Sequence, residues 1–295
     1  MGLVVTIANR KGGVGKTTLA IALAETFVFE HKKSAVIVDL DPQSSASEIL
    51  LSEREYADRL EQQNTLSGFF RSSLSDHKLN ISNVLSHAKH SLSGRGAVDL
   101  AVAVNSPELW DLEYEVLRSN QELEYRSAVK RAIGKLSDTF DVVIIDCPPG
   151  KMMAAEEAVL SSNMVLCPIV PERLSVWGMG KMKEYFSDLE VNHTIPPWRF
   201  VISRFVGTTT EAKRQVELIY EQYREHFLTE MQGFVGFRRS EFIGLDRAEI
   251  VVKRIAMFRD KPDDIRTLEQ FYGPAITKQL RTIAKKIEST HARHG

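Results

Sequence analysis

The chain has little of several features that define other protein classes. Its 295 residues include two cysteines, Cys147 and Cys167, which are too few for a disulfide scaffold and suit a reducing cytoplasm. No run approaches about 18 uncharged apolar residues, so a membrane-spanning helix is not expected. The first apolar run begins at Leu3, so we also expect no signal peptide. The formal net charge is only -1, and total charge therefore gives no argument for a nucleic-acid partner.

A glycine-rich segment, residues 11–18 (KGGVGKTT), lies between an apolar run at 3–8 and a helix-like run at 19–24. Strand, glycine-rich loop and helix in this order are the context of a phosphate-binding loop. Glycine lets the backbone wrap a phosphate chain with its N–H groups pointing inward, and the helix N-terminus adds partial positive charge. Lys16 would reach the β- and γ-phosphates of a nucleotide, and the Thr17 hydroxyl would bind Mg²⁺.

The loop departs from the usual pattern G-x-x-x-x-G-K-[ST] at its first position, where Arg10 replaces glycine. A second lysine, Lys11, follows directly, although Lys16 already serves the phosphates. In one interpretation, Lys11 is a surface cation that adds positive potential. In the other, it points out of its own site and contacts the phosphate in a second subunit.

Two further apolar runs end in acidic residues. Residues 35–38 (AVIV) lead into Asp39 and Asp41, and residues 141–145 (DVVII) lead into Asp146. Continuous β-branched runs are typical of strands buried on both faces of a parallel sheet. Ligands bind at the carboxyl ends of such strands, so these carboxylates should surround the loop that follows the first strand. Asp146 is placed to hold Mg²⁺ through water, as a Walker-B acid does.

The whole chain alternates between strand and helix patterns. Strands are predicted at 3–8, 35–40, 98–104, 141–146, 164–169, 199–203 and 234–237, and helices at 16–30, 107–117, 121–138, 152–162, 176–189, 211–227 and 275–289. This alternation predicts an α/β fold with a doubly wound, mostly parallel sheet of about seven or eight strands flanked by helices. We expect residues 1–295 to form a single domain, with 43–97 as surface helices and loops beside the nucleotide.

Together the motifs resemble the ParA/MinD group of deviant Walker-A P-loop ATPases. The segments KGGVGKTT at 11–18, VDLDPQSSAS at 38–47 and DVVIIDCPP at 141–149 look like those of ParA-type partition ATPases in particular. The resemblance covers most of residues 3–290, and its strong part lies in the first 170 residues.

The resemblance implies a role for each matching residue. Lys11 would be the signature lysine that crosses the interface of an ATP-sandwich dimer, and Asp41 would position the attacking water. Asp39 would support either the water shell of Mg²⁺ or the loop itself. The expected catalytic residues are Lys11, Lys16 and Asp41, and the expected Mg²⁺ residues are Thr17, Asp39 and Asp146. The expected ATP-binding residues are Lys11, Gly12, Gly13, Val14, Gly15, Lys16, Thr17 and Thr18.

The same resemblance implies a function in DNA partition. ATP would close a homodimer, the dimer would bind double-stranded DNA nonspecifically, and a ParB-like centromere-binding protein or other cargo adaptor would stimulate slow hydrolysis and release. We expect a cytoplasmic, nucleoid-associated protein. Because the chain starts directly in a strand, it resembles the short form of the family, which has no N-terminal helix-turn-helix domain.

Basic residues are concentrated near the C-terminus. Residues 238–295 hold 13 Lys and Arg against 8 Asp and Glu. Such a surplus can hold DNA phosphates without recognising sequence, but charge alone fits a solvated helix face equally well. The family resemblance favours DNA contacts. The first candidates are Arg238, Arg239, Lys253, Arg254 and Arg259, and Lys285 with Lys286 ranks second.

Two other functions stay open. A stripe of Ile276, Leu280, Ile283 and Ile287 at helical spacing would suit a MinD-like membrane-associated positioning ATPase, although such a stripe more often packs on its own sheet. We therefore do not expect a membrane partner. The other possibility is a metabolic or signalling relative, namely a reductase-type ATPase, a ligase or a tyrosine kinase. The sequence shows neither the added ligands nor the tyrosine-rich tail that these would need.

Overall fold

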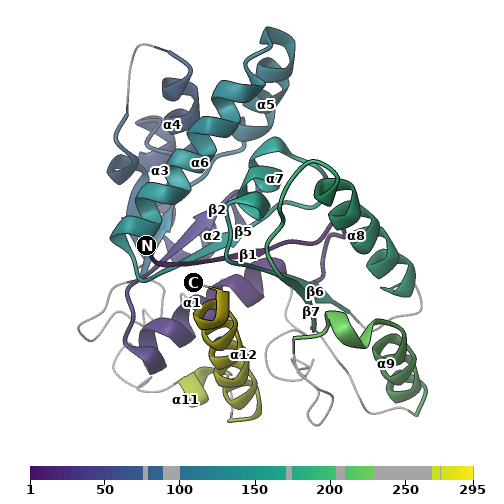
Figure 1. Cartoon of the computed structure of the whole chain (residues 1–295). Helices are drawn as coiled ribbons and strands as arrows, with labels where there is room; N and C mark the ends of the chain where they lie inside the picture. The colour runs from purple at the N-terminus through teal and green to yellow at the C-terminus, as the bar shows by residue number, and fades with distance from the viewer. Residues whose placement is uncertain are drawn as a thin grey trace.

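The computed structural model describes residues 1–75, 79–88, 100–170, 175–203, 210–228, 268–272 and 274–294. Within them, one seven-stranded sheet has the order β3-β4-β2-β5-β1-β6-β7 (Figure 1). The strands are β1 (Leu3–Ile7), β2 (Ala35–Asp39), β3 (Leu85–His87), β4 (Leu100–Ala103), β5 (Val142–Asp146), β6 (Met164–Ile169) and β7 (Trp198–Ile202). Only the β3–β4 pair is antiparallel among these strands. The predicted doubly wound, mostly parallel sheet is confirmed.

Helices cover both faces of the sheet (Figure 1). In the described part of the chain they are α1 (Lys16–His31), α2 (Ser45–Leu50), α3 (Glu53–Glu61), α4 (Leu66–Ser73), α5 (Glu108–Ser119), α6 (Glu122–Thr139), α7 (Met153–Leu160), α8 (Ser175–Glu190), α9 (Thr210–Tyr223), α11 (Leu268–Tyr272) and α12 (Pro274–His294). Two short 3-10 helices are η1 (Ile81–Val84) and η2 (Arg224–His226). Helices therefore lie between most successive parallel strands, as right-handed crossovers require.

The two faces of the sheet bury separate apolar clusters, because successive side chains of a strand point to opposite faces. In β1, Val4 belongs to one cluster, whereas Leu3 and Val5 belong to the other. In β5, Ile145 belongs to the first of these clusters and Ile144 to the second. The first cluster includes residues of α4 to α9, and the second includes residues of α1, α2, α11 and α12. The strands are thus covered on both sides, which explains their continuous apolar sequences.

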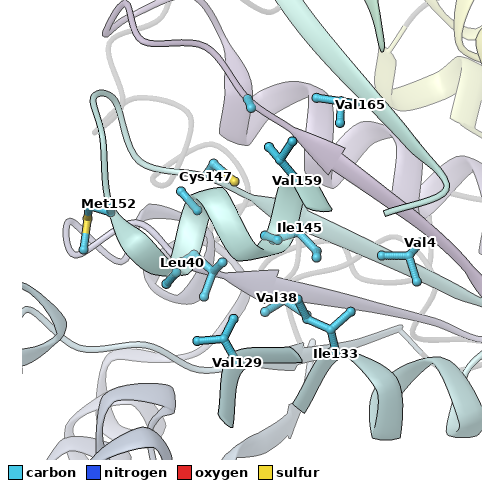
Figure 2. Close-up of a cluster of buried hydrophobic side chains, with 14 of the residues drawn as sticks. Val4, Val38, Leu40, Val129, Ile133, Ile145, Cys147, Met152, Val159 and Val165 are labelled. Atoms are coloured by element: carbon cyan, nitrogen blue, oxygen red, sulfur yellow. The ribbon is translucent and has the colours of Figure 1, made fainter. Parts of the chain in front are cut away.

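Part of the first cluster is drawn in Figure 2. Val38 of β2 and Ile145 of β5 lie among Val129 and Ile133 of α6 and Val159 of α7. Burying one such side chain stabilises the fold by roughly 1.5–3 kcal/mol. This packing holds β2 and β5 side by side, and both strands end at the candidate site.

Helices form in the described part of residues 43–97, and two of them also contribute to the core. Leu66 and Phe70 of α4 are buried in the first cluster and Leu50 of α2 in the second. The short strand β3, which we did not predict, joins the edge of the sheet beside β4. A helix of six or eight residues repeats its apolar face only once or twice, so its burial leaves little periodicity in the sequence.

The C-terminal helix forms as predicted and packs inward. Leu280, Ile283 and Ile287 of α12 are fully buried in the second cluster, and α12 packs against α1 and α11. These three residues of the apolar stripe are therefore part of the core. The predicted strand at 234–237 lies outside the described residues, and the single domain over 1–295 stays a prediction. No helix in the described ranges has the length and apolar character needed to span a bilayer.

Candidate functional site

The strand register gathers the acidic residues beside the glycine-rich loop. In the sheet, β5 lies between β2 and β1, and Asp146 is level with Asp39 on one side and Ile7 on the other. Neighbouring strands lie about 4.8 Å apart. The loop leaves β1 directly after Ile7, so the loop and both carboxylates share one short stretch of the carboxyl edge. This is the place where open α/β sheets bind ligands.

The glycine-rich loop has the backbone that its sequence predicts. Gly13 and Gly15 have φ of 71° and 88°, which side-chain-bearing residues rarely adopt, and Gly15 caps the N-terminus of α1. A Cβ added at Gly12 or Gly13 would meet no atom within 4 Å, so the space over these residues is open to a ligand. The N-terminus of α1 opens toward the same place and favours an anion there.

Three hydrogen bonds outside the predicted motif hold this loop. The Asn9 side chain accepts from the Lys11 backbone N–H at 2.9 Å and donates to the Pro168 carbonyl at 2.8 Å. At the far side, the Ser203 hydroxyl donates to the Val14 carbonyl at 2.5 Å. Asn9 and Ser203 were not predicted as site residues. Both follow strands, where a polar residue is common, so only the fold identifies their contact with the loop.

The two lysines of the loop lie in different environments. Lys16 is 6% exposed, and its ammonium donates to the Lys11 carbonyl at 3.3 Å. Burial lowers the pKa of Lys16, while Asp146 and Asp41 act in the opposite direction. By contrast, the side chain of Lys11 is exposed. Thr17 and Thr18 follow Lys16 in the first turn of α1 and are half-buried.

Asp39 is fully buried and supports the loop that follows β2. One of its carboxylate oxygens accepts from both the Ser47 N–H and the Ser47 hydroxyl at 2.8 Å, and the other accepts from the Asp41 N–H at 3.3 Å. Burial raises the pKa of Asp39 to about 7. Of the two roles expected for Asp39, loop support is the one that these contacts serve, and its role toward Mg²⁺ stays a prediction.

Asp146 differs from Asp39 because its carboxylate is buried without a well-formed hydrogen bond among the described residues. Burial raises the pKa of Asp146 well above its usual range, and the nearby Asp39 adds to the rise. The Thr17 hydroxyl and the Lys16 ammonium offset only part of this effect. A buried carboxylate whose hydrogen-bonding capacity is not filled can still bind a cation or the water around one.

Asp41 sits at the turn between β2 and α2 and is 8% exposed. Its side chain accepts from the Gln43 N–H at 2.9 Å, and its carbonyl accepts from the Asn105 side chain at 3.3 Å. The Asn105 backbone N–H in turn donates to the Ser47 hydroxyl at 3.2 Å. Asn105, at the end of β4, thus connects the Asp41 turn to the residue that holds Asp39. No role was predicted for Asn105 or Ser47.

The structure therefore brings Lys16, Thr17, Asp39, Asp41 and Asp146 to one edge of the sheet, with Lys11 exposed at the rim of the loop. Within the described ranges, no three His, Cys, Asp or Glu residues are grouped so that they could hold a metal ion. The predicted DNA contacts, which are Arg238, Arg239, Lys253, Arg254 and Arg259, lie outside the described residues. Lys285 and Lys286 are exposed on α12.

Two kinds of comparison place this arrangement among known proteins, the first by sequence. A family model described as an AAA domain, AAA_31, matches residues 2–195. The chromosome partitioning protein ParA of Myxococcus xanthus is 28% identical over 183 residues, covering 62% of this chain and 57% of that protein. The sporulation initiation inhibitor protein Soj of Bacillus subtilis is 25% identical over 188 residues, covering 62% and 64%. The chain thus spans less than two thirds of the length of these relatives.

The second comparison is with solved structures. Apo McdA from Cyanothece aligns with a TM-score of 0.71 at 16% identity, over 97% of this chain and 99% of that one. Cobyrinic acid a,c-diamide synthase from Mycobacterium smegmatis, solved with a bound ATP analog and magnesium, aligns with a TM-score of 0.67 at 21% identity, over 90% and 98%. At these identities the likeness shows a shared fold.

Proposed function

Since the chain belongs to the AAA_31 domain family and is similar to ParA-type partition proteins, we propose that it is an ATP-driven switch for DNA segregation. In this proposal, ATP closes a sandwich dimer that binds DNA nonspecifically, and slow hydrolysis releases it. One observation carries the proposal: the exposed Lys11 and the buried Lys16 lie in the same loop, beside the carboxylates of Asp41 and Asp146.

The contacts of the site support a division of work among its residues. The backbone of residues 12–15 would cradle the phosphates, and Lys16 would neutralise them within its own subunit. Thr17 and Asp146 would hold Mg²⁺, which, when bound, screens the charge that develops on the phosphates. Asp41 would orient the attacking water, while the contacts of Asp39 keep the Asp41 turn in place.

Lys11 would complete the site of the neighbouring subunit. An extra cation is most useful where negative charge develops during phosphoryl transfer, and a cation supplied by a second subunit makes hydrolysis depend on assembly. Because Lys16 is buried inside the loop and Lys11 is exposed at its rim, we assign the contact across the interface to Lys11. The resulting enzyme would be a slow ATPase whose output is the lifetime of the dimer.

DNA binding and release complete the proposed cycle. The surplus of cations in 238–295 would hold DNA phosphates, with Arg238, Arg239, Lys253, Arg254 and Arg259 as the first contacts. A ParB-like centromere-binding protein or other cargo adaptor would stimulate hydrolysis and so release the dimer. The protein would then act in the cytoplasm on the nucleoid.

Retention on immobilised nonspecific DNA, measured with ATP, with ADP and without nucleotide, tests this function. We expect retention only with ATP, and a steep loss as salt concentration rises. Arg238→Glu with Arg239→Glu should reduce retention and leave ATP hydrolysis intact. The matched control is Lys130→Glu with Arg131→Glu, two adjacent exposed cations on α6. The proposed DNA contacts would be rejected if retention on DNA were the same with ATP, with ADP and without nucleotide. They would also be rejected if both double variants lost retention to the same extent.

The MinD-like alternative loses its main support in the structure. Leu280, Ile283 and Ile287 of the stripe are buried in the second cluster, where α12 packs against α1 and α11, so these three side chains are not available to a lipid surface. Binding to anionic vesicles that requires ATP, combined with no retention on DNA, would restore this alternative.

A further inference from the structure

One face of α5 exposes large apolar side chains that the proposed ATPase cycle does not use. Trp110, Tyr114 and Leu117 are 61%, 62% and 51% exposed. Their spacing of four and three residues places them on one stripe of the helix. Leu123, the second residue of α6, is 75% exposed. Single exposed apolar residues are ordinary, but a stripe with two aromatic side chains is typical of an interaction surface.

The surroundings of this stripe are acidic. Residues 108–124 contain five exposed carboxylates and one cation, Arg118. The Arg118 guanidinium lies 5.8 Å from the centre of the Tyr114 ring, and the exposed Glu115 is paired with Arg71 of α4. Glu108, Asp111, Glu122 and Glu124 are also exposed. The stripe therefore presents an aromatic centre with a negative rim.

The inner side of α5 is tied to the candidate site. The buried carboxylate of Glu113 accepts from the Met153 and Ala154 N–H groups at 2.9 and 2.7 Å and from the Tyr125 hydroxyl at 3.1 Å. These two N–H groups begin α7, which follows the loop after Asp146. At the other end, α5 starts three residues after Asn105, whose side chain donates to the Asp41 carbonyl. One helix thus connects the exposed stripe with both acidic loops.

We propose that the outer face of α5 is a docking surface for a basic amphipathic helix of another protein. An apolar face on such a helix would cover Trp110, Tyr114 and Leu117, and its flanking cations would meet the carboxylates of the rim. A second copy of this chain fits less well, because a symmetric contact would bring the same carboxylates together. An anionic lipid surface would be repelled by the same charges.

The docked helix would rest on the element that joins the Asp41 turn to the start of α7. Only this consequence, an influence on hydrolysis, depends on the proposed function. Docking itself needs no nucleotide, so its test can fail while the ATPase proposal stands, and the reverse is also true.

The test uses a fluorescent synthetic peptide of about 18 residues, with leucine at helical spacing and lysine elsewhere. Its binding to the full chain is followed by fluorescence anisotropy without nucleotide. The double variant Trp110→Ala with Tyr114→Ala should weaken binding by at least about tenfold, as expected for two aromatic anchors. Asp111→Asn with Glu108→Gln should weaken it less and reduce its dependence on salt.

Two controls separate docking from general attraction. Trp177→Ala removes a tryptophan of α8 that is 72% exposed, and should leave the affinity unchanged. A scrambled peptide of the same composition, which has no apolar face, should bind at least about tenfold more weakly. The proposal is overturned if the Trp110 and Tyr114 double variant binds like the wild type while circular dichroism shows it folded. The proposal is also overturned if the scrambled peptide binds as tightly as the amphipathic one. It is likewise overturned if the wild-type chain self-associates and the Trp110 and Tyr114 double variant does not.

Discussion

The inner wall of the site, formed by Lys16, Asp39 and Asp146, differs from the outer rim of the phosphate loop, formed by Arg10 and Lys11. On the inner wall, Lys16, Asp39 and Asp146 are buried, and their charges act on one another. On the rim, Arg10 and Lys11 are exposed beside glycines whose surroundings are open. In our proposal, the wall holds a nucleotide within one subunit, and one cation of the rim serves a second subunit.

The largest expected effect comes from removing a charge of the inner wall. Lys16→Ala removes a cation whose charge acts on Asp146, and it should lower ATP hydrolysis by about 10²–10³-fold, as the loss of one preorganised charge does elsewhere. Binding of a fluorescent ATP analog should also be lost. Lys151→Ala, which removes an exposed lysine from the loop after Asp146, is the matched control and should change little. Normal nucleotide binding by Lys16→Ala would show that the wall has been misassigned.

Removing the Lys11 cation from the rim should separate dimer assembly from nucleotide binding. Lys11→Ala should abolish the ATP-dependent dimer in sedimentation experiments, while each subunit keeps most of its affinity for ATP. Arg10→Ala removes the adjacent exposed cation and should preserve the dimer. If the two variants behave alike, the rim acts through general positive potential, and Lys11 has no special role in the interface.

Asp146→Asn tests how much the buried charge of the inner wall lowers the stability of the protein without nucleotide. An acid whose pKa is raised by folding destabilises the folded state increasingly as the pH rises from its unfolded pKa toward its folded pKa. The variant should therefore melt at a higher temperature than the wild type without nucleotide, with the gain increasing with pH; each kcal/mol corresponds to about 2–4 °C. The variant should lose Mg²⁺-dependent ATP hydrolysis. A lower melting temperature at pH 8 would mean that the Asp146 carboxylate stabilises the empty site.

The smallest expected effect is at Ser203, a buried residue that follows β7 and contacts the phosphate loop. Its hydroxyl contributes one hydrogen bond to the Val14 carbonyl, worth about 1 kcal/mol. Ser203→Ala should weaken nucleotide binding by about fivefold, as titration calorimetry would measure. Ser289→Ala, on the exposed side of α12, is the control. An unchanged affinity would show that the loop holds its shape without this contact.

The sequence was enough to predict the sheet and the place where its acidic ends meet. The continuous apolar runs predict buried strands, and the acidic residues that end them, Asp39 and Asp146, predict a site. The strand register confirms that these two residues lie side by side. The strand β3 could not be predicted in this way. It has three residues, of which Leu85 is half-buried and His87 exposed, so it shows neither a continuous run nor a useful alternation.

The parts of the site that were missed are polar residues whose partners lie far away in the sequence. Ser203 reaches Val14, and Asn105 reaches Asp41, across 189 and 64 residues. Glu113 has the same character, since it looks like a polar residue of an ordinary helix but is buried against the start of α7. Composition and periodicity carry no information about such pairs, because they depend on how the helices cross the sheet.

The most direct test of the central claim mixes two variants that should each be inactive alone. Lys11→Ala keeps a complete pocket but cannot complete its partner's, whereas Asp41→Ala keeps Lys11 but cannot orient water. In a mixed dimer, the Lys11→Ala subunit would receive Lys11 from its partner. An equal mixture, concentrated enough to form dimers, should therefore hydrolyse ATP, which neither variant does alone. Random pairing of the two kinds of subunit would give about a quarter of the wild-type rate, because half of the dimers would be mixed and each would have one complete site. No recovery, with mixed dimers shown to form, would contradict the claim that Lys11 acts across the interface.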